Sequence, residues 1–306
     1  MDRRLVGGLL FVLVVTLAVV IPSLGGLRRE GTASPIQLPD APRVGDCLLQ
    51  PLTDFISIPL DRTRPLLAPS FAPCDGREVA GEVVAVVRAT GGISARLRQA
   101  EASGVDCYRS SLEYSGLVLT DGRYVVAGHS PNDPVNWNLT INVRTAWVVP
   151  APLLRTAGQS WVACIAAPLS GATFRGRLAD AFSGGMLPDE FGFCWQQRTP
   201  SAEGSVSCGG RHFAELVSLG TIADGTGIAL GDIESSCQRL SALVIGRTDP
   251  TAAGRLTVAT SVSSQRVAPV PPLPQKLNVV CSLEPLAYPL SGSVVGLGDQ
   301  PIPYSK

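Results

Sequence analysis

Eight cysteines are the feature of this 306-residue chain that most restricts its fold. Their number is even, they are widely spaced, and all of them follow an apolar N-terminal segment. This usage favours disulfides and an oxidising compartment, and the alternative is buried free thiols in a cytosolic domain. There is no Cys-x-x-Cys pair and there are only 2 histidines, so the spacing predicts no metal site. The cysteines are Cys47, Cys74, Cys107, Cys164, Cys194, Cys208, Cys237 and Cys281.

The cysteines fall into two sets of four with matching surroundings, which indicates an internal duplication. A glycine stands two residues before both Cys47 and Cys194, and residues 74–80 align without a gap on residues 208–214 with four identities. Each half has the apolar pattern of three strands, a helix and two further strands. We therefore expect an α+β fold of two tandem, disulfide-stapled modules, each an antiparallel sheet with a helix.

Helical spacing of apolar residues predicts where the helices lie. One helix is expected over residues 95–115, interrupted at Gly104, and its counterpart over residues 232–245. A further helix is expected over residues 174–182, where it would connect the two modules.

If every disulfide joins two cysteines of the same module, few pairings are possible. Duplication favours the same pairing in both modules. We expect a nested pattern in which the first cysteine of each set bonds the fourth and the second bonds the third. The predicted pairs are Cys47 with Cys164, Cys74 with Cys107, Cys194 with Cys281, and Cys208 with Cys237.

Residues 5–24 are apolar and uncharged, long enough to cross a hydrocarbon core of about 30 Å. They predict a single transmembrane helix, because a cleaved signal peptide usually has a shorter apolar run and a small-residue site after it. Arginine pairs on both sides leave the positive-inside count tied, so cysteine usage decides the orientation. We expect a single-pass protein of the cell membrane with its modules outside the cytoplasm.

The charge pattern excludes nucleic acid as an expected partner, and the sequence divides into seven expected parts. The formal net charge is zero and no basic stripe is present, so nucleic acid is not an expected partner. The parts are a cytoplasmic N-terminus (1–4), the anchor (5–24), a linker (25–43), the first module (44–172), the connecting helix (173–190), the second module (191–298) and a tail (299–306).

The sequence offers no complete catalytic set. A serine hydrolase would need His129 or His212 as its base, and no Gly-x-Ser-x-Gly segment is present. His212 and Glu215 are three residues apart but lack the second histidine of the zinc protease motif, and in a strand they would point to opposite faces. We expect no catalytic residue, cofactor or metal. The candidate binding residues are His212, Glu215, Arg211 and Arg77.

Three segments carry a resemblance to a known family: Val-Gly-Asp-Cys at 44–47, Cys208 followed by His-x-x-Glu, and Gly-Gln-x-Trp-Val-x-Cys at 158–164. Together they resemble the septum formation family of actinobacterial envelope proteins, over residues 44 to about 298. The resemblance implies a membrane-anchored extracytoplasmic protein associated with cell division, with no established activity or cofactor. The first half departs from the pattern, since Glu78 replaces the histidine and the glutamate is shifted to Glu82.

These observations lead to three functional hypotheses. The leading one is a non-enzymatic envelope protein that binds a division or cell-wall partner, either a protein or peptidoglycan. The second is an extracytoplasmic hydrolase using His212 and Glu215, because a paired histidine and glutamate can do acid-base work. The third is a structural spacer or sensor ectodomain, in which one half could be deleted without effect.

Overall fold

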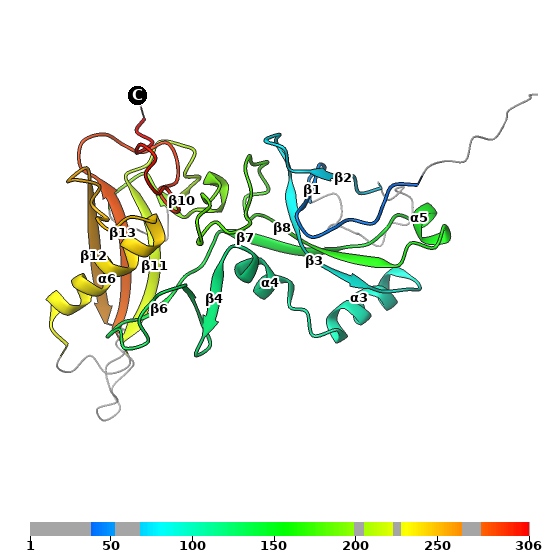
Figure 1. Ribbon diagram of the computed structural model, residues 1–306, viewed down its shortest axis with the longest axis horizontal. Coiled ribbons are helices and arrows are strands. Elements are labelled where there is room, and N and C mark those ends of the chain that lie inside the picture. Colours follow the sequence, from blue (N-terminus) through cyan, green and yellow to red (C-terminus); the bar gives the residue numbers. More distant parts are fainter. Residues whose placement is uncertain (1–37, 53–67, 199–204, 223–227, 265–276, 306) are drawn as a thin grey trace, which may run out of the picture. The chain divides into compact units, whose positions relative to one another are not determined.

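Two antiparallel sheets form the framework of the protein, one in each predicted module (Figure 1). They belong to one compact unit that begins at Ala41. The computed structural model describes residues 38–52, 68–198, 205–222, 228–264 and 277–305.

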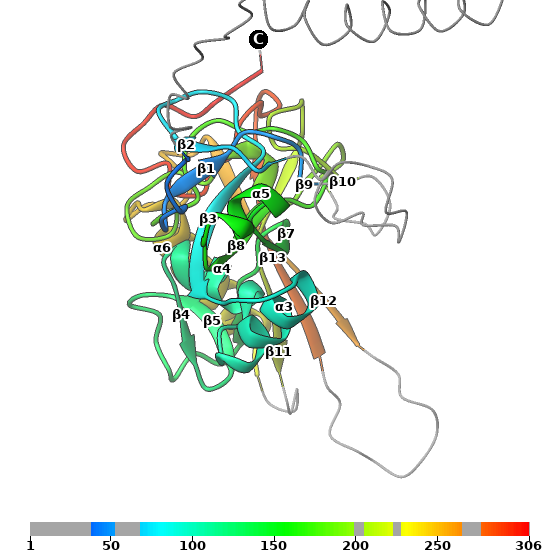
Figure 2. The same ribbon diagram turned by 90° about the vertical axis from the view of Figure 1, so that its right-hand side faces the viewer.

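The first sheet has the strand order β2-β1-β3-β8-β7, with every neighbouring pair antiparallel. Helices α3 and α4 follow β3 and are separated near Gly104, as the sequence predicts. Helix α4 lies against β7 and β8 (Figure 2). The elements are β1 (Asp46–Leu48), β2 (Phe71–Pro73), β3 (Gly81–Arg88), α3 (Ile93–Ala102), α4 (Cys107–Tyr114), β7 (Val143–Val148), α5 (Pro152–Thr156) and β8 (Trp161–Pro168).

The second sheet repeats this order as β10-β9-β11-β13-β12. Its helix α6 (Leu230–Ile245) lies on one face and buries residues at helical spacing, among them Ile233, Cys237 and Val244 (Figure 1). It ends at Gly246, whose left-handed φ of 77° suits a glycine cap. The strands are β9 (Cys194–Trp195), β10 (Ser205–Val206), β11 (Ala214–Ile222), β12 (Leu256–Ser264) and β13 (Leu277–Pro285).

The strand registers show that the two sheets are equivalent residue by residue. Glu82 of β3 lies opposite Cys47, and Glu215 of β11 lies opposite Cys194. Each strand then has an irregularity in its register at the same distance from its glutamate. The shift lies between residues 83 and 85 in β3 and between residues 216 and 218 in β11. This is the arrangement that duplication of one ancestral module would leave.

The gap-free alignment of residues 74–80 with 208–214 is wrong by one residue in its second part. Isolated bridges join Val79 to Phe174 and His212 to Leu290. Val79, and not Glu78, is therefore the equivalent of His212. The first module has one extra residue in the turn that follows its second cysteine. The order of the residues alone does not show where that residue is inserted.

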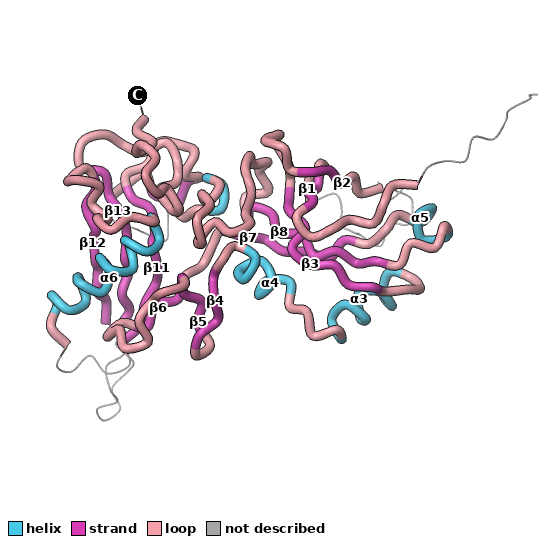
Figure 3. The backbone as a smooth tube through the Cα atoms, viewed as in Figure 1, coloured by secondary structure: helices cyan, strands magenta, loops and turns pink. Residues whose placement is uncertain are grey.

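The connecting helix predicted over residues 173–190 is absent, because the segment is loop up to a short 3₁₀ helix at Asp189–Phe191 (Figure 3). Gly176 has a φ of 95°, in the left-handed region that a right-handed helix excludes. The bridge from Phe174 to Val79 attaches this segment to the first module. The predicted tail is likewise attached to the second module, where Tyr304 bridges Leu290.

The expected fold also needs correction at its N-terminal end. The anchor predicted over residues 5–24 and the cytoplasmic residues 1–4 lie outside the described residues. Among the helices that the structure describes, none combines the length and the apolar character needed to cross a membrane. The fold that the structure supports is α+β with disulfides, and it does not include the transmembrane helix of the prediction.

The nested disulfide pattern is wrong. In each module the first cysteine bonds the second and the third bonds the fourth, and none of the eight is free. The reason is topological. The strands β1 and β2 are antiparallel neighbours, so the first two cysteines have their Cα atoms 5.2 Å apart, while the third cysteine, on the helix, bonds the fourth, on the strand next to the central one. The pairs are Cys47–Cys74, Cys107–Cys164, Cys194–Cys208 and Cys237–Cys281.

An insertion in the first module reaches the second sheet. It consists of β4 (Leu117–Thr120), β5 (Arg123–Val126) and β6 (Asn136–Asn138), and β6 pairs antiparallel with β11. Trp137 on β6 is fully buried, and its indole nitrogen donates to the Ser236 hydroxyl at 2.7 Å. The two modules therefore share core contacts.

Replacing Gly220 with alanine is expected to lower the free energy of unfolding by about 1–2 kcal/mol. A Cβ atom there would lie 2.5 Å from Val135 Cγ1 and 2.6 Å from Trp137 Cε3, so β6 would have to move off β11. Gly231 is the matched control, because a Cβ atom there meets nothing within 4 Å. Urea unfolding of Gly220→Ala and Gly231→Ala measures both changes, and equal stabilities would contradict the prediction.

Candidate functional site

A buried glutamate occupies the same position in each module. Glu82 and Glu215 both have 0% exposure. Each carboxylate accepts a backbone hydrogen bond from the segment that follows the last strand, from Leu178 N at 2.7 Å and from Val294 N at 2.8 Å. The two glutamates therefore hold equivalent segments against their sheets.

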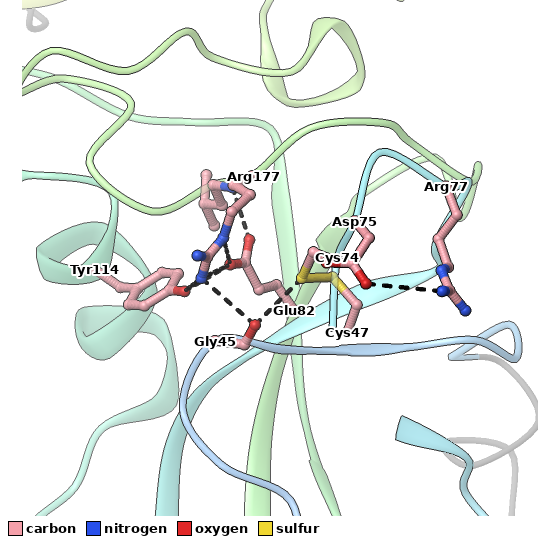
Figure 4. The surroundings of a disulfide bond; sticks show 9 residues. Gly45, Cys47, Cys74, Asp75, Arg77, Glu82, Tyr114 and Arg177 are labelled. Atoms are coloured by element: carbon pink, nitrogen blue, oxygen red, sulfur yellow. Dashed lines mark hydrogen bonds and ion pairs between the residues drawn. A yellow bond between two sulfur atoms is a disulfide. The ribbon is translucent and has the colours of Figure 1, made fainter. Parts of the chain in front are cut away.

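In the first module the carboxylate is neutralised by a cation (Figure 4). Arg177 donates to Glu82 Oε1 through Nε at 3.1 Å and Nη2 at 3.0 Å, and the Tyr114 hydroxyl donates to the same oxygen at 2.6 Å. Burial raises the pKa of Tyr114, and its bond to Glu82 raises it further. The Arg177 side chain is 53% exposed, so the ion pair joins a buried carboxylate to a partly solvated guanidinium.

In the second module hydrogen bonds take the place of that ion pair. Ser293 stands at the position equivalent to Arg177, and its hydroxyl donates to Glu215 Oε1 at 2.5 Å. Burial raises the pKa of Glu215 to about 7, although the bonds from Ser293 and Val294 oppose this shift. The buried carboxyl is therefore paired with a guanidinium in the first module. In the second module, the equivalent carboxyl is close to half-protonated near neutral pH.

His212 is fully buried beside Glu215. Its Nδ1 lies 2.8 Å from the Gly210 carbonyl oxygen, which can only accept, so Nδ1 carries the hydrogen and Nε2 presents its lone pair. Burial lowers the pKa of His212, and Nε2 has no hydrogen-bond partner among the described residues. Burial thus favours the uncharged imidazole, whose Nε2 is an acceptor that no described residue uses.

The expectation that His212 and Glu215 point to opposite faces is wrong. One potential ligand atom from each of Cys194, Cys208, His212 and Glu215 lies within 4.8 Å of the others. The alternation rule fails because His212 precedes β11, which begins at Ala214, and is held by its bridge to Leu290 instead of a continuous strand.

The other candidate binding residues lie at the surface. Arg211 is exposed and its guanidinium lies 5.5 Å from the centre of the Phe213 ring. Arg77 forms an exposed ion pair with Asp75 at 3.9 Å (Figure 4). Neither arginine joins the buried glutamate of its module. His129, the other histidine that a serine hydrolase could use as its base, is half-buried beside a cavity of about 20 Å³, room for about one water molecule.

Sequence reasoning missed Arg177, Tyr114 and Ser293. A signal for two of them was present, since the glutamate-binding segments read Phe-Arg-Gly-Arg-Leu at 174–178 and Leu-Ser-Gly-Ser-Val at 290–294. Both have an apolar residue, a central glycine and a second apolar residue at the same spacing. The helical spacing of apolar residues in the first copy concealed this match.

The contribution of Glu215 to the stability of the protein is expected to fall as pH rises from about 4.5 to about 7, and Glu215→Gln should remove this component. The folded pKa lies above the ordinary value of 4.5, so the folded state binds the proton more tightly. The contribution is therefore present below about pH 4.5 and lost as pH passes about 7. A shift of this size corresponds to at most about 3 kcal/mol.

Urea unfolding at about pH 5 and about pH 8 measures this slope. Glu234→Gln is the control, because Glu234 is an exposed residue of α6 and its loss should leave the slope unchanged. A Glu215→Gln variant with the wild-type slope would show that another group causes it.

Comparison of the chain with protein-family models, with curated proteins and with solved structures finds no match. The resemblance to the septum formation family therefore stays a prediction from the three sequence segments.

Proposed function

We propose that the chain is a non-enzymatic binding protein of the cell envelope, and that its second module docks a protein partner involved in division or cell-wall assembly. The chemistry of the cysteines supports the proposed compartment. All eight form disulfides, and such bonds persist where the surroundings are oxidising. The association with division follows from the septum formation resemblance.

One observation carries the proposed docking surface: the same sheet face is covered in the first module and open in the second. In the first module the face of β8 opposite Cys164 carries Trp161, Ala163, Ile165 and Ala167, each at most 4% exposed. Leu48, Leu52 and Phe71 pack against these side chains. This face is therefore a second core layer, on the side of the sheet away from α4.

The equivalent face of the second module has small polar side chains in place of that core. We define the open face by the cross-strand neighbours Leu219, Thr221, Val280, Asn278, Ser261 and Ser263. Leu219 is 48% exposed, the two serines are exposed, and the remaining three are half-buried. Duplication supplied the same framework twice, and only this copy left the face uncovered.

The composition of the open face favours a protein over a glycan. It has no charge, and an exposed leucine and a valine lie among hydroxyl and amide groups, as in the centre of many protein interfaces. Sugar rings usually stack on exposed aromatic side chains. Trp137, Trp161 and Trp195 are buried instead, and Trp147 is half-buried.

Site-specific photo-crosslinking in cells tests this proposal. A photoreactive residue at Ser261 should give an adduct with an envelope protein of division or wall synthesis, and Leu219→Arg should abolish the adduct and cause a septation defect. A probe at Glu234, on the exposed side of α6, is the control and should give no such adduct. Self-adducts alone, or an adduct unaffected by Leu219→Arg, would contradict the proposed docking surface.

The hydrolase hypothesis receives no support from the geometry. A hydrolase must expose its acid and base to substrate, yet His212 and Glu215 are both fully buried. The spacer hypothesis can be tested by deletion, since it requires that one half can be removed without effect. The pairing of β6 with β11 leads us to expect that deleting the first module destabilises the second.

A further inference from the structure

Four metal-binding side chains meet in the core of the second module. Cys194, Cys208, His212 and Glu215 come from β9, the turn after β10 and the start of β11, and all four are fully buried. In the oxidised chain the two sulfur atoms are bonded to each other. After reduction they would be two thiols beside an imidazole and a carboxyl group.

The imidazole is already oriented as a ligand. Metal-binding histidines commonly donate their other ring N–H to a carbonyl or carboxylate, as His212 Nδ1 does to Gly210. Its Nε2 is buried and has no hydrogen-bond partner in the part of the chain that the structure describes. A buried polar atom left unpaired costs about 1–3 kcal/mol, so a ligand that accepts this lone pair would remove a real penalty.

The two modules differ at the two positions beside this glutamate. There the buried glutamate is neutralised by the guanidinium of Arg177, and Val79 fills the place of His212. The second module has Ser293 and His212 at these two positions. Among the residues that the structure describes, the second module thus has no built-in cation at this glutamate and has a nitrogen ligand that the first module lacks.

We propose that Cys194, Cys208, His212 and Glu215 bind one zinc ion when the chain is reduced. Two thiolates, one imidazole and one carboxylate make a tetrahedral set for zinc. At zinc–ligand distances of about 2.0–2.3 Å neighbouring ligand atoms lie about 3.5 Å apart. The four atoms now lie within 4.8 Å of one another, so the more distant ones must approach by about 1 Å, and the two sulfur atoms, bonded at 2.04 Å, must separate after reduction. Zinc displaces the two thiol protons as it binds. This proposal is independent of the docking surface.

Cobalt(II) titration of the reduced full-length chain tests the site. A phosphine reductant cleaves the disulfide, becoming phosphine oxide with oxygen from water and leaving two thiols, and it does not compete as a thiol ligand. The reduced chain should bind one tightly held equivalent of cobalt with thiolate charge-transfer bands, and zinc should displace it. The oxidised chain should bind none, and equal affinity in both states would overturn the proposal.

Two variants and one mapping experiment locate the ion. His212→Val, which installs the residue of the first module, should weaken cobalt binding by at least about a hundredfold, since loss of an outer partner alone costs about 10–100-fold. Cys47→Ser with Cys74→Ser should leave it unchanged.

Alkylation of the reduced wild-type chain with and without zinc, followed by mass spectrometry, gives an answer even if a variant does not fold. Zinc should protect Cys194 and Cys208 and leave Cys47 and Cys74 reactive. Protection that is absent, uniform over the cysteines, or centred on another pair would each overturn the proposal.

Discussion

A chain without the Cys107–Cys164 disulfide is expected to lose about 4 kcal/mol of its free energy of unfolding, the largest effect of any disulfide in the protein. The bond closes a sequence separation of 57 residues, the longest of the four. A longer closed loop removes more conformational entropy from the unfolded chain. The bond also ties α4 to β8, an internal strand whose residues are all buried, so its loss acts within the core of the first module.

The comparison that tests this uses paired alanine replacements and urea unfolding under oxidising conditions. Cys194→Ala with Cys208→Ala is the matched control, because its separation is 14 residues and the expected loss is about 3 kcal/mol. The order of the two losses is the result that matters. A larger loss from the shorter loop would show that local packing, and not loop closure, sets the contribution.

Replacing Arg177 with serine is expected to destabilise the protein by about 3 kcal/mol at pH 8. The change replaces the cation of Glu82 with the residue type found beside Glu215, and it leaves Glu82 fully buried, where an uncompensated charge is costly. The expected loss lies at the low end for buried pairs, because the Arg177 side chain is 53% exposed and solvent screens part of its charge.

The pH dependence of this loss separates charge from packing. A buried carboxylate without a cation is costly because of its charge, so a more acidic solution should reduce the loss. The loss should therefore be smaller at about pH 5 than at about pH 8. Arg175→Ser is the control, since its pair with Glu78 is exposed on both sides and its removal should cost less than about 1 kcal/mol. Equal losses at both pH values would refute the electrostatic explanation.

The sequence does not show that the two buried glutamates are equivalent or which residues bind them, and the structure explains why. The shift to Glu82 is visible in the sequence, but its meaning depends on a single inserted residue between Cys74 and Val79, which only the strand register reveals. Arg177 is distant in sequence from Glu82, and its segment has the apolar spacing of a helix. The local pattern around Arg177 therefore indicates a helix, whereas in the folded protein this residue lies in a loop and binds Glu82.

The sequence by itself determined the α+β class, the two matched sets of cysteines and the positions of the helices beside the third cysteine of each set. These follow from local periodicity and from repeated residue types, which survive without knowledge of long-range contacts. The tertiary structure alone decided the disulfide partners, the meeting of His212 with Glu215, and which sheet face is covered. Each of these depends on strand order and register, where a shift of one residue changes every neighbour and no local signal records it.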